Sequence, residues 1–172
     1  MTDPVEELFD VVDESDRVMR QAPRRVVHAE GWLHRAVHVL VFNQAGQLFL
    51  QKRSMSKDMS PGLWDSSCSG HLDAGEGYDH AAVRELQEEI GLKLEHAPTR
   101  LFRIEACKET GQEFVWVYRV FAEGPFVLCP EEIDRGEWIW PQELSQRIAS
   151  RPHEYCSSFR HIWARITKDD IL

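Results

Sequence analysis

The sequence predicts one α/β domain over residues 1–172, built around a mixed β-sheet with helices packed on its faces. Segments with the composition of strands outnumber the helical segments. The helical segments are spread along the chain, which places them on the faces of a sheet and not in a separate bundle. A length of 172 residues with 42% hydrophobic residues is enough for one sizeable core.

The first half of the chain contributes most of the expected strands. An N-terminal hairpin is expected over residues 8–21, where LFDVV and RVMRQ flank the turn DESD. HRAVHVLVFN (34–43) is rich in β-branched residues, and QLFLQKR (47–53) alternates polar and apolar residues after the turn NQAG. LWDSSCSG (63–70) is expected to return to the sheet.

A helix is expected over residues 78–90, because Gly91 provides the usual stop signal. Proline favours the first helical turn, so Pro141 should open another helix. The elements expected after residue 92 are strands at 100–107, 113–122 and 136–140, and C-terminal helices at about 141–149 and 155–166.

Net charge and apolar patterning argue against polymeric and membrane partners. The net charge of −9 repels polyanions, so a nucleic-acid polymer is not expected as the partner. No apolar run approaches the ~20 residues of a membrane span. A small phosphorylated substrate stays compatible with this charge, because a metal ion can supply positive charge locally.

The N-terminus and the cysteines favour a cytoplasmic protein. MTDPVEELFD is acidic and lacks the features of a secretion signal. The four cysteines are widely spaced without a CxxC pair, which favours reduced thiols over a zinc knuckle.

Three glutamates gather on one face of the helix expected at 78–90. Glu85, Glu88 and Glu89 are spaced i, i+3 and i+4, where like charges repel. Arg84 lies four residues before Glu88 and can neutralise one carboxylate, which leaves two. The face is either simply solvated or a site for Mg²⁺ or Mn²⁺, which prefer several oxygen ligands.

The residues flanking this helix favour the metal site. The stretch GHLDAGEGYDHAAVRELQEEIGL (70–92) matches G-x5-E-x7-R-E-U-x-E-E-x-G-U without exception, where U is aliphatic. This pattern resembles the signature of the Nudix hydrolases. The matching residues are Gly70, Glu76, Arg84, Glu85, Leu86, Glu88, Glu89, Gly91 and Leu92.

The resemblance implies a Nudix fold, in which a mixed sheet is sandwiched between helices (α/β/α). It also implies cleavage of a diphosphate bond in a nucleoside diphosphate linked to a group X, by water and with Mg²⁺ or Mn²⁺. The implied catalytic residues are Glu88, Glu89 and Arg84, and either Glu88 or Glu89 would be the general base. The implied metal ligands are Glu85, Glu88, Glu89 and the carbonyl of Gly70. Arg84 would pair with Glu76 and brace the loop against the helix.

A longer stretch, residues 32–71, is similar to the Nudix subgroup that resembles isopentenyl-diphosphate delta-isomerase. That isomerase uses a histidine-rich metal site, a strand glutamate and a cysteine just before a Gly-His dipeptide. Here His34 and His71 match two of the histidines, His28 lies about one residue from a third, and Glu113 matches the strand glutamate.

The cysteine is where this chain departs from the isomerase pattern. Ser69 precedes Gly70, and Cys68 lies one residue earlier, which on a strand points its thiol to the opposite face. The intact R-E-L-Q-E-E pattern also favours a hydrolase over an isomerase. A third alternative is a non-catalytic binding module, although such domains usually lose one of the signature glutamates.

Several polar residues outside the signature have two interpretations each. Lys52, Arg53 and His71 are candidate substrate contacts, although Lys52 and Arg53 suit a surface position equally well. His34 and His38 share a strand face, either as a ligand pair or as neutral, hydrogen-bonded histidines. Trp64 and Trp116 could stack a base, although tryptophans in strands usually pack in a core, as is expected of Trp138 and Trp140. Three acidic residues could supply an extra metal ligand or a general base, with simple solvation as the alternative: Glu132, Asp134 and Glu137.

The signature does not identify the group X, because specificity depends on residues far from the helix. Simple nucleoside di- and triphosphates are the first expectation for the substrate. An apolar patch on a strand or on the C-terminal helix would allow a homodimer.

Overall fold

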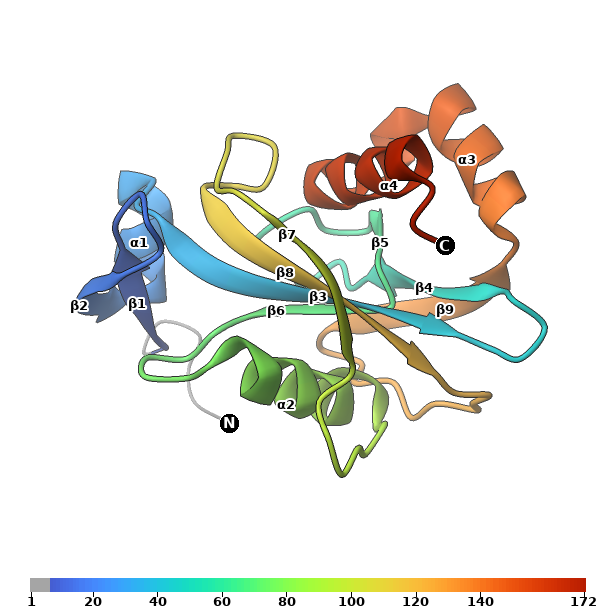
Figure 1. Cartoon of the computed structure of the whole chain (residues 1–172), viewed down its shortest axis with the longest axis horizontal. Coiled ribbons are helices and arrows are strands. Elements are labelled where there is room, and N and C mark those ends of the chain that lie inside the picture. Colours follow the sequence, from blue (N-terminus) through green and yellow to red (C-terminus); the bar gives the residue numbers. More distant parts are fainter. Residues whose placement is uncertain (1–6) are drawn as a thin grey trace.

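The computed structural model describes residues 7–172, and within this range a mixed seven-stranded sheet forms the centre of the molecule (Figure 1). Strand β3 (His34–Phe42) runs parallel to β8 (Glu113–Phe121) and antiparallel to β4 (Leu48–Arg53) and β6 (Cys68–His71). The remaining strands are β5 (Trp64–Asp65) and β9 (Ile133–Ile139), both beside β4, and β7 (Thr99–Ile104) beside β8. Residues 1–6 of the predicted domain lie outside the described range.

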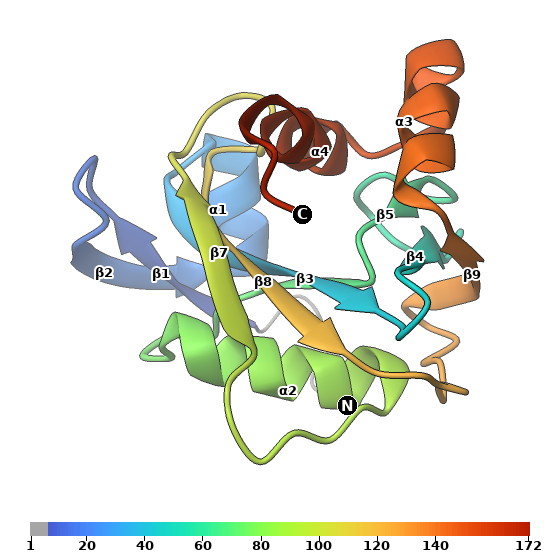
Figure 2. The same cartoon turned by 45° about the vertical axis from the view of Figure 1, so that its right-hand side comes forward.

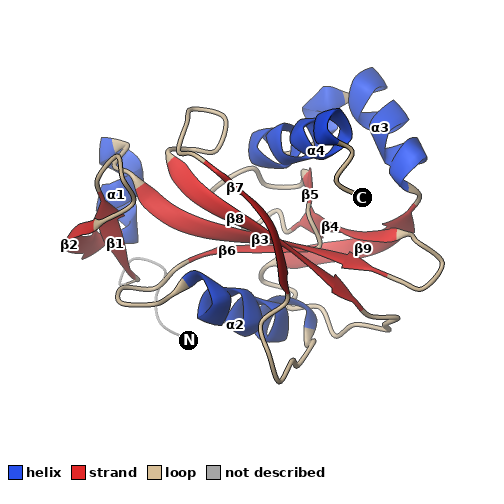
Figure 3. Cartoon of the chain, viewed as in Figure 1, coloured by secondary structure: helices blue, strands red, loops and turns tan. Residues whose placement is uncertain are grey.

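Helices cover both faces of this sheet. Helix α2 (Tyr78–Ile90) packs on one face, while α3 (Pro141–Ser150) and α4 (Ser157–Asp169) pack on the other (Figures 2 and 3). A short 3₁₀ turn, Pro152–Glu154, connects α3 to α4. The predicted α/β/α arrangement is therefore confirmed.

The central strand supplies both cores by alternation. Val37, Val39 and Val41 point into the core beneath α2, whereas Ala36 and Leu40 point into the core beneath α3 and α4. A strand buried on both faces reads as a nearly continuous apolar run, which is what the sequence shows here.

The N-terminal hairpin forms a second, two-stranded sheet. Its strands are β1 (Leu8–Val12) and β2 (Val18–Pro23), and they lie at one end of the main sheet, beside the start of α2 (Figure 1). Helix α1 (Arg24–Glu30) follows at once and was not predicted. The helix has seven residues, and Val27 is the one that is buried. A single buried position gives no repeating apolar pattern from which a helix could be predicted.

The stretch expected as one strand at 63–70 is two short strands. Ser66 and Ser67 separate β5 from β6, and the hydroxyl of Ser67 accepts a hydrogen bond from the amide of Val41 at 2.8 Å. The Ser67 hydroxyl thus takes the place of a backbone carbonyl as the hydrogen-bond acceptor for one amide of the central strand β3. Elsewhere the predicted elements shift by a few residues at their ends, most clearly β9, which begins at Ile133 and not at 136.

Among residues 7–172, no helix is long and apolar enough to span a bilayer. The four cysteines are all free thiols.

Candidate active site

The signature helix α2 is held in place by an apolar stripe. Ala82, Leu86 and Ile90 are fully buried against the sheet, and Gly91 ends the helix in the left-handed region with φ of 69°. The amide of Gly91 donates to the carbonyl of Gln87, which satisfies one of the free carbonyls at the helix end. This anchoring turns the glutamates toward strand β6 and the loops beside it.

Glu85 lies directly against strand β6. Glu85 is 9% exposed, and a Cβ atom placed on Gly70 would lie only 2.2 Å from its carboxyl carbon. Any side chain at position 70 would therefore displace the carboxylate. The glycine of the signature is required here for close approach of a carboxylate to a strand backbone.

Glu89 is the most enclosed of the three carboxylates. It is 4% exposed and accepts hydrogen bonds from the side-chain amide of Gln51 at 3.2 Å and from the backbone amide of Ser69 at 3.3 Å. Gln51 was not among the predicted site residues. The hint in the sequence is a glutamine that directly follows the apolar run LFL of β4, and the structure shows that its side chain is buried.

The surroundings of this carboxylate pair favour protonation in the absence of a cation. Burial raises the pKa of Glu89 to about 7, and the charge of Glu132 adds to the shift. Burial and the neighbouring charge of Glu89 raise the pKa of Glu85 well above its usual value. Two buried carboxylates that repel each other are stabilised by a cation between them.

These donors fit a hard divalent ion. Glu85 and Glu89 present buried oxygens, and the Glu88 side chain, 59% exposed, adds a carboxylate that is open to solvent. Gly70 leaves the space beside them free of a side chain. Oxygen-only donor sets of this kind suit Mg²⁺ or Mn²⁺.

Arg84 connects the signature loop to the helix. Its Nε and Nη2 atoms donate to the two oxygens of Glu76, each at 2.8 Å, which makes a bidentate ion pair. Its Nη1 atom donates to Glu85 at 2.9 Å and to Glu88 at 3.1 Å. Burial alone would raise the pKa of Glu76, but the hydrogen bond from Arg84 and others lower it.

A second polar cluster forms where the hairpin end meets the sheet. His28 of α1, His34 of β3, His71 of β6 and Glu113 of β8 each present one ligand atom, and these atoms all lie within 4.8 Å of one another. His71 Nε2 lies 2.8 Å from Glu113 Oε1. Such a set of three imidazoles and one carboxylate suits a transition metal.

The electrostatics of this His/Glu cluster also fit a cation. His34 Nε2 is buried and, among the described residues, makes no hydrogen bond, although it lies 3.3 Å from Glu113 Oε1. Burial and the nearby His71 and His34 lower the pKa of His28 to about 4. Neutral imidazoles with free nitrogens are the form that binds metal.

Ser69 and Cys68 lie on opposite faces of the sheet. Ser69 pairs with His38 of β3, whereas Cys68 pairs with Val39 and packs in the core beneath α2. Burial raises the pKa of the Cys68 thiol, and the charge of Glu89 adds to this. The thiol therefore points away from the face that His38 and Ser69 share.

The candidate substrate contacts do not all converge on the carboxylates. Arg53 donates to Asp65 at 3.3 Å and to the carbonyl of Met59. Lys52 lies over the ring of Trp64, 5.7 Å from its centroid, on the α4 side of the sheet. His71 belongs to the His/Glu cluster, and its carbonyl accepts from Arg84.

Of the three acidic candidates after β8, one lies close enough to influence the carboxylates of α2. Glu132 forms an ion pair with Lys57, and its charge acts on Glu89. Glu137 pairs with Arg147 of α3, away from the carboxylates. Asp134 is exposed.

His38 is buried and hydrogen-bonded to Ser66, so it does not join His34 in the His/Glu cluster. Trp64, Trp116 and Trp138 pack against the cores, and Trp140 is 50% exposed.

The comparisons with known proteins agree with this geometry. Residues 32–158 match the family model described as the NUDIX domain. An uncharacterised Nudix hydrolase of Yersinia pestis is 37% identical over 145 residues, which cover 82% of this chain and 77% of that protein. An isopentenyl-diphosphate Delta-isomerase of Serratia proteamaculans is 33% identical over 154 residues, which cover 88% and 86%.

The fold has solved counterparts. The crystal structure of DR0079 from Deinococcus radiodurans superimposes with a TM-score of 0.74 at 30% identity, and the match covers 84% of this chain and 90% of that one. The family model spans most of the chain. The two relatives align with this chain over most of their own length. The chain therefore belongs to the Nudix family.

Proposed function

We propose that this protein is a metal-dependent hydrolase that cleaves a diphosphate bond in a nucleoside di- or triphosphate or a related nucleoside diphosphate. The observation that carries the proposal is the intact acidic group on α2. Glu85 and Glu89 are buried beside Gly70, and Arg84 contacts Glu85 and Glu88 while it pairs with Glu76.

The metal would be held by Glu85, Glu88 and Glu89 with the carbonyl of Gly70. A bound Mg²⁺ or Mn²⁺ supplies charge neutralisation at the diphosphate and lowers the pKa of water. Arg84 fixes the orientation of the carboxylates through its contacts with Glu85 and Glu88.

Glu88 and Glu89 would both bind the metal, and Glu88 would in addition act as the general base. Glu89 is enclosed, and Gln51 and Ser69 fix its orientation, so it suits a ligand role. Glu88 is exposed to solvent and can accept a proton from an attacking water. The positive charges of Arg53 and Lys57 interact with the carboxylate of Glu89, and these two side chains would contact the substrate phosphates.

The test is a product screen with purified protein. Nucleotides, nucleotide sugars, dinucleoside polyphosphates and isoprenyl diphosphates are incubated with Mg²⁺ or Mn²⁺, and phosphate and monophosphate products are measured. In water enriched in ¹⁸O, one product should carry the label. Absence of phosphate or monophosphate release from all four classes would exclude hydrolysis of these substrates and leave a binding module as the alternative.

A second candidate is isopentenyl-diphosphate isomerisation, which the His/Glu cluster favours. His28, His34, His71 and Glu113 lie together as a metal site would require, and curated isomerases are among the relatives. Ser69 stands against it, because a serine hydroxyl donates a proton far less readily than a thiol with a pKa of ~8.5.

One assay separates the two candidates. The protein is incubated with isopentenyl diphosphate, and the allylic product is followed by NMR beside a nucleotide control. We expect nucleotide hydrolysis without allylic product. Conversion to dimethylallyl diphosphate without phosphate release would reverse the assignment.

A further inference from the structure

The N-terminal hairpin, which lies outside the matched residues 32–158, contacts the signature loop directly. The backbone amide of Ala74 donates to the carbonyl of Leu8 at 2.8 Å. The backbone amide of Gly75 donates to the Oδ2 atom of Asp10, also at 2.8 Å. The loop between β6 and α2 is therefore tied to strand β1 at two successive residues.

Asp10 is an unusual residue for its position in this hairpin. It is 4% exposed and lies between Phe9 and Val11, which are also buried. Its second carboxylate oxygen accepts from the side-chain amide of Gln21 at 3.2 Å. Within residues 7–172, no lysine, arginine or histidine forms an ion pair with it.

A buried carboxylate without a cation is costly, and an apolar residue would pack a hairpin core at lower cost. The stability of the hairpin does not account for Asp10. Its contact with the loop does, because Asp10 Oδ2 accepts from the amide of Gly75 and so fixes a loop residue that is itself exposed to solvent.

The contact lies close to the residues that orient the carboxylates. Gly75 has φ of 80°, and the next residue, Glu76, makes the bidentate pair with Arg84. Arg84 in turn donates to Glu85. A short chain of hydrogen bonds and ion pairs thus runs from Asp10 through the loop to the acidic group.

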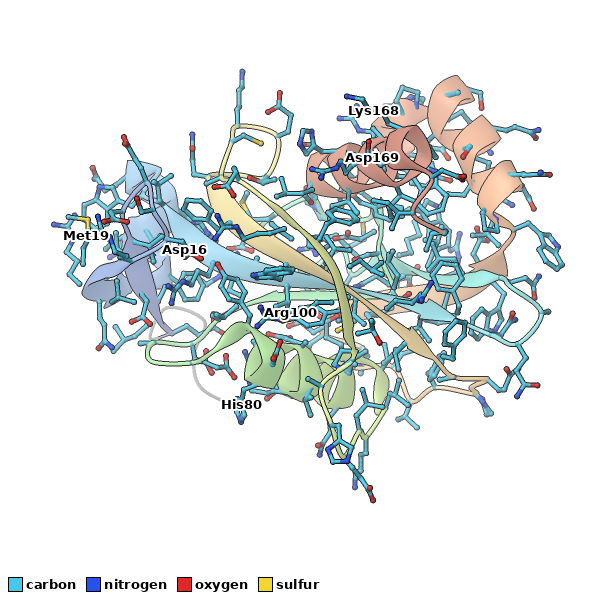
Figure 4. All side chains as sticks on the ribbon, in the orientation of Figure 1. Asp16, Met19, His80, Arg100, Lys168 and Asp169 are labelled. Atoms are coloured by element: carbon cyan, nitrogen blue, oxygen red, sulfur yellow. The ribbon has the colours of Figure 1, made fainter. Side chains whose placement is uncertain are left out.

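A second anchor holds the other end of the loop. Asp16, in the hairpin turn, accepts from the hydroxyl of Tyr78, the first residue of α2, at 2.8 Å. Arg35 of β3 donates to Asp16 at 2.6 Å, which ties the turn to the sheet. Figure 4 shows Asp16 where the hairpin meets the sheet, and His80 on the outer surface of α2.

We propose that Asp10 is a positioning residue for the hydrolysis described above, on which this proposal rests. Through the amide of Gly75, Asp10 holds the signature loop in the shape in which Glu76 and Arg84 align the metal-binding carboxylates. The hairpin is therefore part of the catalytic framework, although it supplies no metal ligand to the acidic group.

The first test compares three variants. Asp10→Ala removes the acceptor and should lower kcat by ~10- to 100-fold and raise the half-saturating Mg²⁺ concentration, as for other residues that support metal ligands, with KM within about threefold. Asp10→Asn keeps one acceptor oxygen for Gly75 and should recover most of the rate. Gln21→Ala removes the other partner of Asp10 without touching the loop, and should stay within about threefold of wild type.

Equal losses in Asp10→Ala and Gln21→Ala, matched by equal falls in Tm, would show that Asp10 only stabilises the hairpin. Unchanged kcat and Mg²⁺ dependence in a folded Asp10→Ala protein would also overturn the proposal.

The second test does not depend on turnover. In the metal-free wild-type protein the Gly75 amide should exchange with solvent at least ~10-fold more slowly than a free loop amide, as measured by NMR. Free exchange at Gly75 would overturn the proposal even if Asp10→Ala fails to fold. Mn²⁺ titration by calorimetry should show weaker binding in Asp10→Ala. If these two results hold while no diphosphate is hydrolysed, the proposed reaction is wrong and the positioning of the metal site by Asp10 stands.

Discussion

Glu89 illustrates how single residues acquire their chemistry here. It is a buried carboxylate whose hydrogen bonds come from the neutral donors Gln51 and Ser69, and its pKa is raised to about 7. Glu88, one residue earlier, is exposed to solvent. Two adjacent glutamates on one helix therefore have different environments, which suits them to different roles.

Replacing either glutamate should strongly reduce turnover. Glu88→Gln and Glu89→Gln should each lower kcat by at least ~100-fold, because each removes an electrostatic or proton-transfer group while keeping the shape of the side chain. Steady-state kinetics on the best substrate of the screen provides the measurement. Glu95→Gln, at an exposed position after the helix, is the matched control. Near wild-type rates and metal affinity in both signature variants would place the site elsewhere.

Cys68 should prove structural. It is fully buried beneath α2, on the face of β6 that it shares with Gly70 and opposite to Ser69, and burial raises the pKa of its thiol, which keeps the thiol protonated. Cys68→Ser should leave hydrolysis within about threefold, with a modest loss of stability from placing a hydroxyl in the core. Activity and Tm are measured on the same preparation. An isomerase activity abolished by this substitution would show that the thiol takes part in chemistry.

At the scale of elements, the loop at 72–77 and helix α2 act as one unit. Arg84 joins them through Glu76 on the loop and Glu85 on the helix, and the hairpin holds the loop from outside. On an isolated helix the mutual repulsion of the three carboxylates would oppose their alignment. The contacts with the loop are therefore needed to hold them in place.

Removing this connection should affect activity more than stability. Arg84→Ala should lower kcat/KM by ~100-fold while Tm falls by only a few degrees, since the apolar stripe of α2 stays intact. Arg100→Ala is the control, because Arg100 also pairs with an acidic residue of α2, the exposed Asp79. A fall in Tm without a specific loss of rate would assign Arg84 to folding only.

At the scale of the whole molecule, the sheet brings two candidate metal sites together. The acidic group on α2 uses one face of β6 through Gly70, and the His/Glu cluster uses the other through His71. Alternation along a strand separates neighbours to opposite faces, so one short strand serves both sites.

The contribution of Glu89 to the stability of the metal-free protein should fall as pH rises through the range from about 4.5 to 7. The folded pKa of Glu89 is about 7, against 4.5 in the unfolded chain, so the folded state binds more protons in this window and loses that advantage as pH increases. Thermal melts with a chelator should show it as a Tm difference between wild type and Glu89→Gln that shifts against the wild type as pH rises, because the opposing titration of the buried histidines is common to both proteins.

Mg²⁺ should reverse the effect, because a bound cation favours the ionised carboxylates and raises Tm by mass action. A Tm difference between wild type and Glu89→Gln that does not change with pH would contradict the assignment. A Tm that is insensitive to Mg²⁺ at neutral pH would count equally against the metal site.

Local patterns were sufficient for much of this molecule. The helix at 78–90 was predicted with the bounds that the structure shows, because the apolar spacing and the glycine stop act within a few residues. The opposite orientations of Cys68 and Ser69 also followed from the period of a strand. Such features depend on backbone geometry that neighbouring residues share.

The contacts between distant segments did not follow from these patterns. Helix α1 was missed, yet it brings His28 to His34, His71 and Glu113. Gln51 and Asp10 were not among the predicted site residues, because each is a single polar residue beside an apolar run of a strand. Their roles depend on which loop or helix packs against them, and sequence spacing carries no information about that packing. Periodicity is a property of one segment, whereas a site is formed by the relative placement of several.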